Sequence, residues 1–410
     1  MKRILLSCLV FLLGVQACAS LVVDSSSSSA QQLAVDLPTT IRTLEADQQF
    51  SQVPFATVAA RLPALDAGEA LNILALSTGG SAGAFGAGAI AGLTRSGSRP
   101  DFGIVTGVSV GALVAPYAYL GPEWDARLLE AFTSDAGEHL LQSRGLGALF
   151  GSSVFQGAPL KRLVDAYVSD EMVEAVAREA ERGRLLLVVT TDVATAEPVV
   201  WDLGAIARNG GAHARTLFRD VLLASASVPG MFPPVMIHVR KDGVFHDEAH
   251  VDGGATMPFF VPAQLTRTRP DASGSSHGTA VYVLIDGPLG DATRVTRLTA
   301  RAVLARSIHA GLNHMLLSTL ELTAANAQLQ GATLQYSAIP DAYPHVEAFH
   351  FQAATMRPLL SYAYGCAQAG RLWTPFRRTE VTGTTERRTS ETERVPCPAE
   401  DELIGSFASR

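Results

Sequence analysis

Short apolar segments alternate along the chain with longer segments of helical character. The apolar runs at 71–76, 185–191 and 281–286 predict strands, and the second of these has the composition of a strand buried on both faces. The segments 84–93 and 302–329 predict helices, because their apolar residues recur at helical intervals or are small enough for close packing. Strands that alternate with helices form a mostly parallel sheet covered on both sides, so the sequence predicts the α/β fold class.

The N-terminus has the pattern of an export signal. Residues 1–3 are Met-Lys-Arg, and Ile4 to Val15 is an apolar run of 12 residues, shorter than the roughly 20 that cross a bilayer. The run ends at Val15-Gln-Ala-Cys18, which resembles the lipobox of bacterial lipoproteins. Residues 1–17 would then be removed and Cys18 would carry a lipid. An ordinary signal cleaved after Ala17 is the alternative. We therefore expect an exported chain, anchored in the outer membrane or else soluble in the periplasm or secreted.

Composition divides the exported chain into a tether, a body and a tail. Residues 18–66 are expected to form a flexible tether and N-terminal extension, since Ser25 to Ser29 is a low-complexity tract. Residues 67–372 are expected to form the folded domain, because 47% hydrophobic and 17% charged residues are sufficient for a large core. Residues 373–410 are rich in Thr, Arg and Glu and are expected to be a polar tail.

Charge and cysteine content narrow the possible partners. A net charge of −7 without a basic stripe gives no reason to expect nucleic acid. Cys8 would leave with the signal and Cys18 would carry the lipid, so Cys366 and Cys397 are the other cysteines of the exported chain and can form a disulfide in an oxidising compartment. These cysteines are too few for a zinc site. No metal or cofactor is expected, and the sequence leaves the oligomeric state open.

One serine lies between two glycines at Gly107-Val-Ser109-Val-Gly111, directly after the apolar segment that ends at Thr106. A strand that turns abruptly into a helix places the turning residue in a strained conformation, and the flanking glycines let strand and helix pass closely. The hydroxyl is then presented at the start of the helix. We therefore predict that Ser109 is a nucleophile, with an ordinary serine in a glycine-rich turn as the alternative.

A glycine-rich loop, Thr78-Gly79-Gly80-Ser81-Ala82-Gly83, separates the first predicted strand from the first predicted helix. Backbone N–H groups at such a helix start can converge on a developing negative charge. The loop is therefore predicted to form an oxyanion hole. A nucleotide-binding loop is the alternative, but Gly83 is not followed by Lys-Ser or Lys-Thr and the spacing is not G-x-G-x-x-G.

The base for Ser109 can be an acid or a histidine. Asp252 follows a short apolar lead and precedes Gly253 and Gly254, which allow its carboxylate to approach another backbone segment; a common turn is the alternative. Histidines placed after the serine are the usual choice in α/β-hydrolases, and no neighbouring residues distinguish one of them here. They are His213, His238, His246, His250, His277, His309 and His314.

In this order, the glycine loop, the serine turn and the Asp-Gly-Gly resemble the motifs of the patatin-like phospholipase family. The resemblance covers about Leu71 to Pro258 and continues more faintly to about Leu372. It implies a three-layer α/β/α fold with a mostly parallel central sheet. Supporting stretches similar to the family's loop extension, central strand, turn and helix end are Ala84–Gly88, Thr190–Asp192, Glu197–Pro198 and Ala224–Pro234.

The resemblance implies a lipid acyl hydrolase with a Ser-Asp dyad and no histidine, and makes 67–372 the catalytic domain. Ser109 would attack the ester and Asp252 would take its proton. The backbone N–H groups of Gly79, Gly80 and Ser81 would form the oxyanion hole. The implied substrate is a phospholipid or another fatty-acyl ester.

The sequence departs from the family pattern at two positions. Thr78 occupies the place of the loop's first glycine, and Ala82 the place where relatives often have a basic residue. If that charge holds a phosphate in relatives, this chain lacks it. Met231-Phe232 and 259–261 are candidates for lining an acyl-chain slot, with core packing as the alternative. Two other functions stay open: a His-dependent esterase, and a non-catalytic envelope lipoprotein that binds lipid.

Overall fold

The structure is a computed structural model that describes residues 40–44, 50–62, 70–145, 151–241, 244–266, 278–290 and 298–376. Every described residue belongs to one compact unit of the chain, Pro38–Arg410. The predicted signal, Cys18, the serine tract, His277 and Cys397 lie outside the described residues. The predictions that concern them stay predictions.

Parallel strands form the centre of the described sheet, whose order is β11-β10-β9-β3-β4-β5-β6-β1-β2. Neighbouring strands from β10 to β5 all pair in parallel, with Ile73 opposite both Ile104 and Val281. The strands predicted at 71–76, 185–191 and 281–286 are confirmed to within a residue or so at each end. The central strands are β10 (Thr333–Ala338), β9 (Ala280–Ile285), β3 (Asn72–Leu76), β4 (Ile104–Val108) and β5 (Leu185–Asp192).

Antiparallel strands complete the sheet at both edges. A hairpin of β7 and β8 joins it through β8, which runs antiparallel to β5 and places Asp252 opposite Thr190. Strands on both sides of 67–372 belong to this same sheet, since β1 and β2 extend one edge and β11 pairs with β10 at the other. These strands are β1 (Thr40–Leu44), β2 (Phe50–Pro54), β6 (Pro198–Asp202), β7 (Val235–Lys241), β8 (Val244–Asp252) and β11 (Thr374–Pro375).

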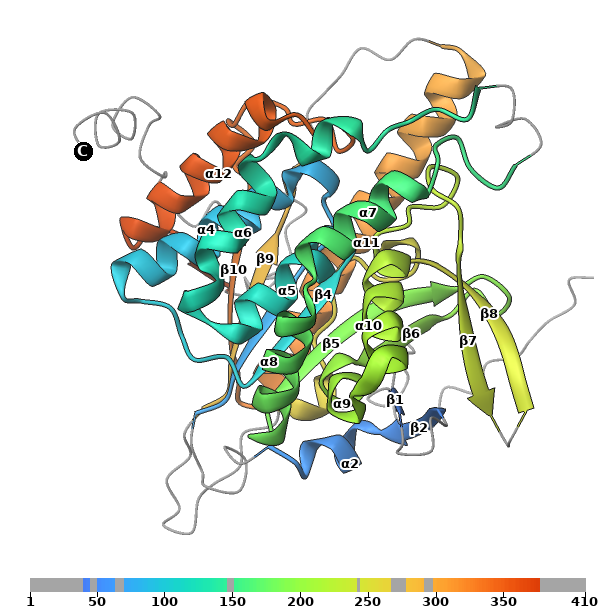
Figure 1. Cartoon of the computed structure of the whole chain (residues 1–410). Helices are drawn as coiled ribbons and strands as arrows, with labels where there is room; N and C mark the ends of the chain where they lie inside the picture. Colours follow the sequence, from blue (N-terminus) through green and yellow to red (C-terminus); the bar gives the residue numbers. More distant parts are fainter. Residues whose placement is uncertain are drawn as a thin grey trace, which may run out of the picture. The chain divides into compact units, whose positions relative to one another are not determined.

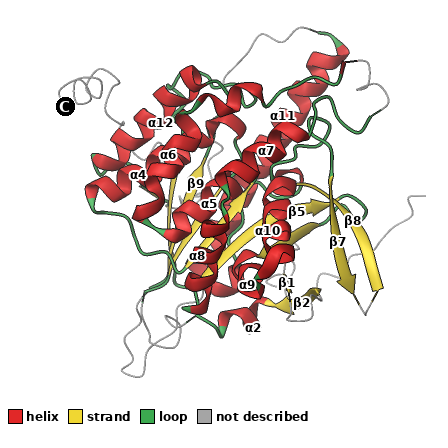
Figure 2. Cartoon of the chain, in the orientation of Figure 1, coloured by secondary structure: helices red, strands yellow, loops and turns green. Residues whose placement is uncertain are grey.

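Helices cover both faces of the sheet and make a three-layer α/β/α fold (Figures 1 and 2). The units β3-α4-β4 and β9-α11-β10 step in opposite directions along the sheet, so right-handed connections place α4 and α11 on opposite faces. The helices on the same face of the sheet as α4 are α5, α6, α7, α8, α9, α10 and α12. The bounds are α2 Phe55–Ala59, α4 Gly83–Ser96, α5 Val110–Leu120, α6 Asp125–Thr133, α7 Ala158–Tyr167, α8 Asp170–Glu181, α9 Leu203–Asn209, α10 Gly211–Ser225, α11 Ala300–Leu329 and α12 Ala353–Gln368.

Small residues let α4 approach its neighbours closely. A Cβ atom on Gly88 would lie 2.1 Å from the carbonyl oxygen of Leu360 in α12, and one on Gly92 would lie 2.5 Å from that of Tyr364. The side of α4 that bears the glycines is therefore packed directly against the α12 backbone. The helix predicted for this Ala/Gly-rich segment is confirmed, as is the one predicted at 302–329.

Two further properties concern the described residues only. None of their helices is both long and apolar enough to cross a membrane. They contain no group of three or more His, Cys, Asp or Glu residues that could hold a metal ion.

Candidate active site

Ser109 occupies a sharp turn between β4 and α5. Its φ of 58° and ψ of −127° lie outside the helical and strand regions, and among the described non-glycine residues only Ala196 also has a positive φ. The flanking glycines are required by space: a Cβ on Gly107 would lie 2.5 Å from the Gly111 carbonyl oxygen, and one on Gly111 would lie 2.5 Å from that of Leu76. A non-glycine residue with φ above zero is costly, so the surrounding contacts hold Ser109 in this conformation.

The Ser109 hydroxyl donates a hydrogen bond to the carboxylate of Asp252. Ser109 Oγ lies 2.6 Å from Asp252 Oδ2, although 143 residues separate them in the sequence. The other carboxylate oxygen, Oδ1, accepts from the Gly254 N–H at 2.7 Å. Both side chains are buried, with 5% of Ser109 and 3% of Asp252 exposed. The structure thus brings together the nucleophile and the acid that the sequence suggested.

Burial controls the protonation of Asp252. It raises the pKa of this carboxyl to about 7, although the hydrogen bonds from Ser109 and Gly254 favour the charged form and lower it. A carboxyl with its ordinary pKa is a weak base for a hydroxyl, whereas one that titrates near neutral pH is far better matched to proton transfer. Near pH 7 about half of the Asp252 carboxyls are therefore charged and able to accept a proton.

None of the described histidines forms a hydrogen bond with Ser109. His250 lies two residues before Asp252 and is fully buried, but its ring nitrogens face Thr190 Oγ1 at 3.0 Å and Glu248 Oε2 at 3.1 Å. His238 Nδ1 pairs with Asp247 on the exposed part of the β7-β8 hairpin. Neither ring is positioned to take the Ser109 proton.

The glycine loop lies beside Ser109, and the structure differs from the prediction at one of its residues. Gly79 and Gly80 have no hydrogen-bond acceptor for their N–H groups among the described residues. The Ser81 N–H, in contrast, donates to the Ala348 carbonyl at 2.8 Å, and the Ser81 hydroxyl donates to the Glu347 carbonyl at 2.7 Å. Ser81 therefore fastens the loop to the segment before α12, which leaves Gly79 and Gly80 as the available donors.

Gly80, Gly253 and Gly254 must also be glycine, because a side chain at these positions would have no space. Gly80 has a φ of +59°, and a Cβ there would lie 2.0 Å from the Ala348 carbonyl oxygen. A Cβ on Gly253 would lie 2.4 Å from the Val189 carbonyl oxygen, and one on Gly254 would lie 2.5 Å from Thr78 Cγ2. At Gly83 a Cβ would lie 2.2 Å from Val110 Cγ2. The motif glycines thus bring the three segments of the site into contact.

Two polar residues that the motifs did not single out support the site. The Ser225 hydroxyl accepts from the Ser109 N–H at 3.0 Å and donates to the Val189 carbonyl at 2.7 Å, so it ties the serine turn to β5. Ser225 lies in the stretch 224–234, for which the sequence carries only a supporting similarity. The Ser109 N–H is thereby engaged in holding the turn.

Asp286 is the second of these residues and lies beneath the glycine loop. Its Oδ1 accepts from the Gly86 N–H at 2.8 Å and its N–H donates to Ser77 Oγ at 2.9 Å, while its Oδ2 has no partner. Burial raises the pKa of Asp286 well above its ordinary value. Asp286 directly follows β9 and is 200 residues away from Gly86 in the sequence. The sequence therefore carries no local signal for this contact.

An apolar cavity opens at Ser109 and Gly80. Its wall includes Tyr117 and Tyr167, whose hydroxyls are bonded to the Tyr167 carbonyl and the Ser134 hydroxyl, both at 2.8 Å. The cavity surface is consequently hydrocarbon over most of its area. Of the predicted slot residues, Phe232 lines it, whereas Phe259 and Phe260 are buried in the core. Other lining residues are Leu113, Phe132, Leu160, Leu163, Val164 and Met356.

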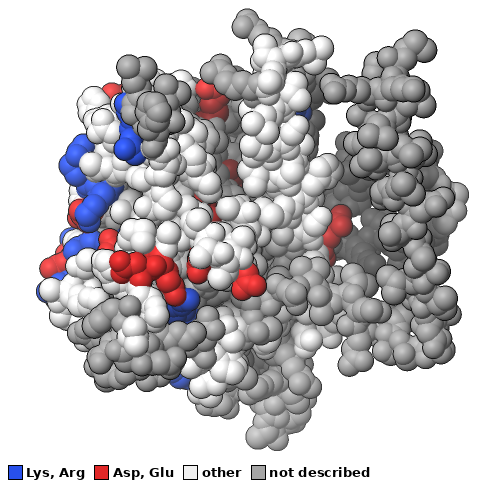
Figure 3. All heavy atoms as spheres, turned by 90° about the vertical axis from the view of Figure 1, so that its right-hand side faces the viewer, with Lys and Arg blue, Asp and Glu red and all other residues white. Residues whose placement is uncertain are grey.

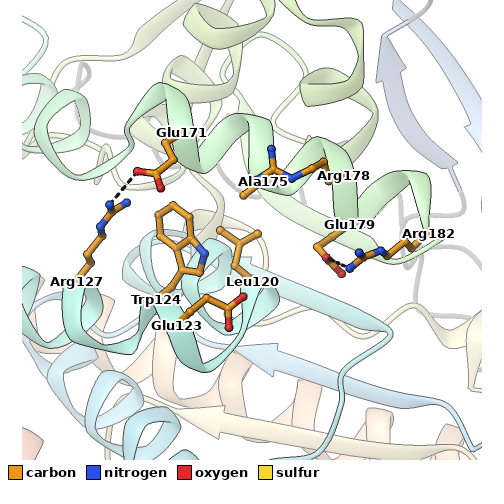
Figure 4. A pocket seen from close by; sticks show the side chains of 9 residues that line it. All are labelled: Leu120, Glu123, Trp124, Arg127, Glu171, Ala175, Arg178, Glu179 and Arg182. Carbon is orange, nitrogen blue, oxygen red and sulfur yellow. Dashed lines mark hydrogen bonds and ion pairs between the residues drawn. The ribbon is translucent and has the colours of Figure 1, made fainter.

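A separate surface hollow lies between α8 and the start of α6 (Figure 4). Its charged side chains are of both signs: Arg127 pairs with Glu171 at 2.8 Å, and Glu179 pairs with Arg182 at 2.5 Å. The hollow includes none of the residues around Ser109.

Cys366 lies in α12, is fully buried and is disulfide-bonded. Its predicted partner, Cys397, is outside the described residues, so the pairing of these two cysteines stays a prediction.

Comparisons with known proteins give structural likenesses and a family match. The structure is similar to the crystal structure of VipD from Legionella pneumophila with a TM-score of 0.31 and 11% sequence identity, over 83% of this chain and 71% of that chain. The search of curated proteins gives no match. Among family models, the match is to the patatin-like phospholipases, over residues 74–264.

That range begins in β3 and ends after β8. It includes the glycine loop, the Ser109 turn and Asp252, but not Asp286 or the helices α11 and α12. The region that holds the candidate active site is therefore similar to the patatin-like phospholipases.

Proposed function

We propose that this chain is a serine acyl hydrolase that cleaves fatty-acyl esters with Ser109 as nucleophile and Asp252 as base. The observation that supports this most directly is the 2.6 Å hydrogen bond from the Ser109 hydroxyl to the Asp252 carboxylate at the mouth of an apolar cavity. The family match over 74–264 supports the same general chemistry. The dyad itself is our proposal.

In the first half of the reaction, Ser109 Oγ attacks the carbonyl carbon of the ester and its proton passes to Asp252 Oδ2. The carbonyl oxygen becomes an oxyanion, which the N–H groups of Gly79 and Gly80 would stabilise. Losing one such donor typically costs about 3 kcal/mol of transition-state stabilisation. The carbon–oxygen bond to the alcohol then breaks, the alcohol takes the proton from Asp252, and the acyl group stays on Ser109.

In the second half, Asp252 accepts a proton from water, whose oxygen attacks the acyl carbon. The bond to Ser109 breaks, the proton returns to Ser109 Oγ, and a fatty acid is released. Both halves need Asp252 charged at the start, and a carboxyl with a pKa of about 7 can both take and return the proton.

The cavity supports a hydrocarbon chain as the acyl group. Its lining is apolar, and its tyrosine hydroxyls are bonded elsewhere, so burial of methylene groups would supply most of the binding energy, about 0.8 kcal/mol for each. Phospholipids and neutral lipid esters both carry such chains, and the cavity favours neither head group.

We also propose that the protein is exported and held in the outer membrane by a lipid on Cys18. The sequence pattern at 15–18 supports this. Labelling cells with a radioactive fatty acid tests it: the wild-type chain should carry the label and Cys18→Ser should not. Equal labelling of both would refute the anchor.

Product analysis on mixed phospholipids and neutral esters tests the enzymatic proposal. Ser109→Ala and Asp252→Asn should each abolish fatty-acid release. Ser153→Ala and Asp125→Asn are matched controls, because they change a buried serine and a buried aspartate whose hydrogen bonds go to residues other than Ser109 and Asp252, and both should keep activity. Release that persists in Ser109→Ala would refute the mechanism. Release that survives Asp252→Asn but not a histidine substitution would favour a His-dependent esterase.

A further inference from the structure

Helix α11 is much longer than the strands it connects. It has 30 residues, Ala300–Leu329, which correspond to about 45 Å at 1.5 Å per residue. Strands β9 and β10 have 6 residues each, or about 20 Å. Because β9 and β10 are parallel, the helix runs back against them and begins at the carboxyl edge of the sheet. Its N-terminal half therefore extends past that edge (Figure 1).

The carboxyl edge is where the candidate active site lies. Ser109 follows the last residue of β4, and the glycine loop follows the last residue of β3. Both strands are parallel to β9. The extending half of α11 and the opening at Ser109 are thus on the same edge of the sheet.

Burial changes along α11. Its C-terminal third is packed, with Leu320, Ala324 and Ala327 buried, and Asn326 Nδ2 donates to Thr266 Oγ1 at 3.1 Å. The N-terminal half instead exposes large apolar side chains at positions four residues apart, which share one face of a helix. These are Leu304 at 61%, Ile308 at 55% and Leu312 at 45%, with Leu298 just before the helix at 92%.

The charge of this segment is opposite to that of the chain. Residues 292–320 contain four arginines (294, 297, 301 and 306) and no aspartate or glutamate, although the whole chain carries −7. Figure 3 views the side toward which this half of α11 extends, and its upper part shows a long stretch without charged side chains. An exposed apolar stripe, in a stretch of sequence whose only charged residues are arginines, is typical of a helix that lies in the surface of an anionic membrane.

We propose that residues 300–316 of α11, here called the docking arm, bind a membrane surface that contains anionic phospholipid. Leu304, Ile308 and Leu312 would enter the boundary between head groups and acyl chains, and the positive charge of Arg301 and Arg306 would attract the lipid phosphates. Binding there brings the carboxyl edge of the sheet, and with it Ser109, to the lipid. The arm would act whether or not Cys18 carries a lipid, and its binding does not require that Ser109 be catalytic.

Vesicle sedimentation tests the docking arm. The full chain with Cys18→Ser and Ser109→Ala has neither the anchor nor the proposed nucleophile, and should bind phosphatidylcholine vesicles that contain phosphatidylglycerol more tightly than phosphatidylcholine vesicles alone. Adding Leu304→Asp and Ile308→Asp should weaken binding at least about tenfold. Leu329→Asp is the matched control, because Leu329 is 83% exposed at the opposite end of the same helix, and should leave binding unchanged.

Equal vesicle binding with and without the substitutions Leu304→Asp and Ile308→Asp would overturn the proposal. So would a change that appears only in oligomeric state by light scattering, because the stripe would then contact a second copy of the chain. In the chain that keeps Ser109, hydrolysis of a soluble short-chain ester should be the same with and without Leu304→Asp and Ile308→Asp. Vesicle binding that persists while Ser109→Ala retains hydrolysis would refute the proposed function and leave the docking arm standing.

Discussion

The charge on Asp252 should destabilise the fold above neutral pH, and Asp252→Asn should remove this cost. Burial raises the pKa of Asp252 from 3.8 to about 7. A carboxyl whose pKa is higher in the folded chain binds its proton more tightly there, so its stabilising contribution is complete below about pH 4 and is lost as pH rises through 7. A difference of roughly 3 in pKa corresponds to about 4 kcal/mol of unfolding free energy.

Urea unfolding of the wild type and of Asp252→Asn, measured between pH 4 and pH 8, gives the required comparison. Asparagine stays neutral throughout, so the unfolding free energy of the variant minus that of the wild type should increase by about 4 kcal/mol across this range. The change with pH is the quantity of interest, because any fixed effect of the substitution cancels. Asp101→Asn is the control, because the Asp101 side chain is 93% exposed. Its unfolding free energy minus that of the wild type should change by less than about 1 kcal/mol over the same pH range.

The titration of Asp252 should also appear in catalysis, where the charged form that destabilises the fold is the active form. Ester hydrolysis needs charged Asp252, so kcat/KM should rise with pH and level off above about 7. The fold would then lose stability over the pH range in which the enzyme gains activity. Parallel stability profiles for the wild type and Asp252→Asn would refute this reasoning, because they would mean that burial does not disfavour the charged carboxylate.

Three further substitutions test the surroundings of the dyad. Gly80→Ala should lower kcat by at least about a hundredfold, because its Cβ would lie 2.0 Å from a carbonyl oxygen, whereas Gly97→Ala, also at positive φ but with open space around it, should keep activity. Asp286→Asn should retain the hydrogen bond from the Gly86 N–H and change thermal stability little. Asp286→Ala should lower the unfolding free energy by about 1–3 kcal/mol, because it leaves that N–H unpaired. Equal losses of stability in both variants would show that the charge of Asp286 matters. Leu163→Trp should fill part of the cavity and reduce hydrolysis of long-chain relative to short-chain esters, and an unchanged ratio would place the acyl chain elsewhere.

The sequence by itself was sufficient for those features that depend on neighbouring residues. A sharp turn from strand to helix needs glycine on both sides of Ser109, and the approach of Asp252 to another backbone needs Gly253 and Gly254, so these requirements appear as short motifs. The central strands were readable for a similar reason. Burial on both faces produces continuous apolar runs, as in 185–191, where every residue of the strand is buried.

Only the tertiary structure decided how these pieces cooperate. The bond between Ser109 and Asp252 spans 143 residues, and the bond between Gly86 and Asp286 spans 200, so neither leaves a local pattern. The same holds for Ser81, whose N–H is taken by a carbonyl 267 residues later in the chain, at Ala348. The exposed stripe on α11 also required the fold, because an apolar helical face reads identically in sequence whether it covers a sheet or extends beyond its edge.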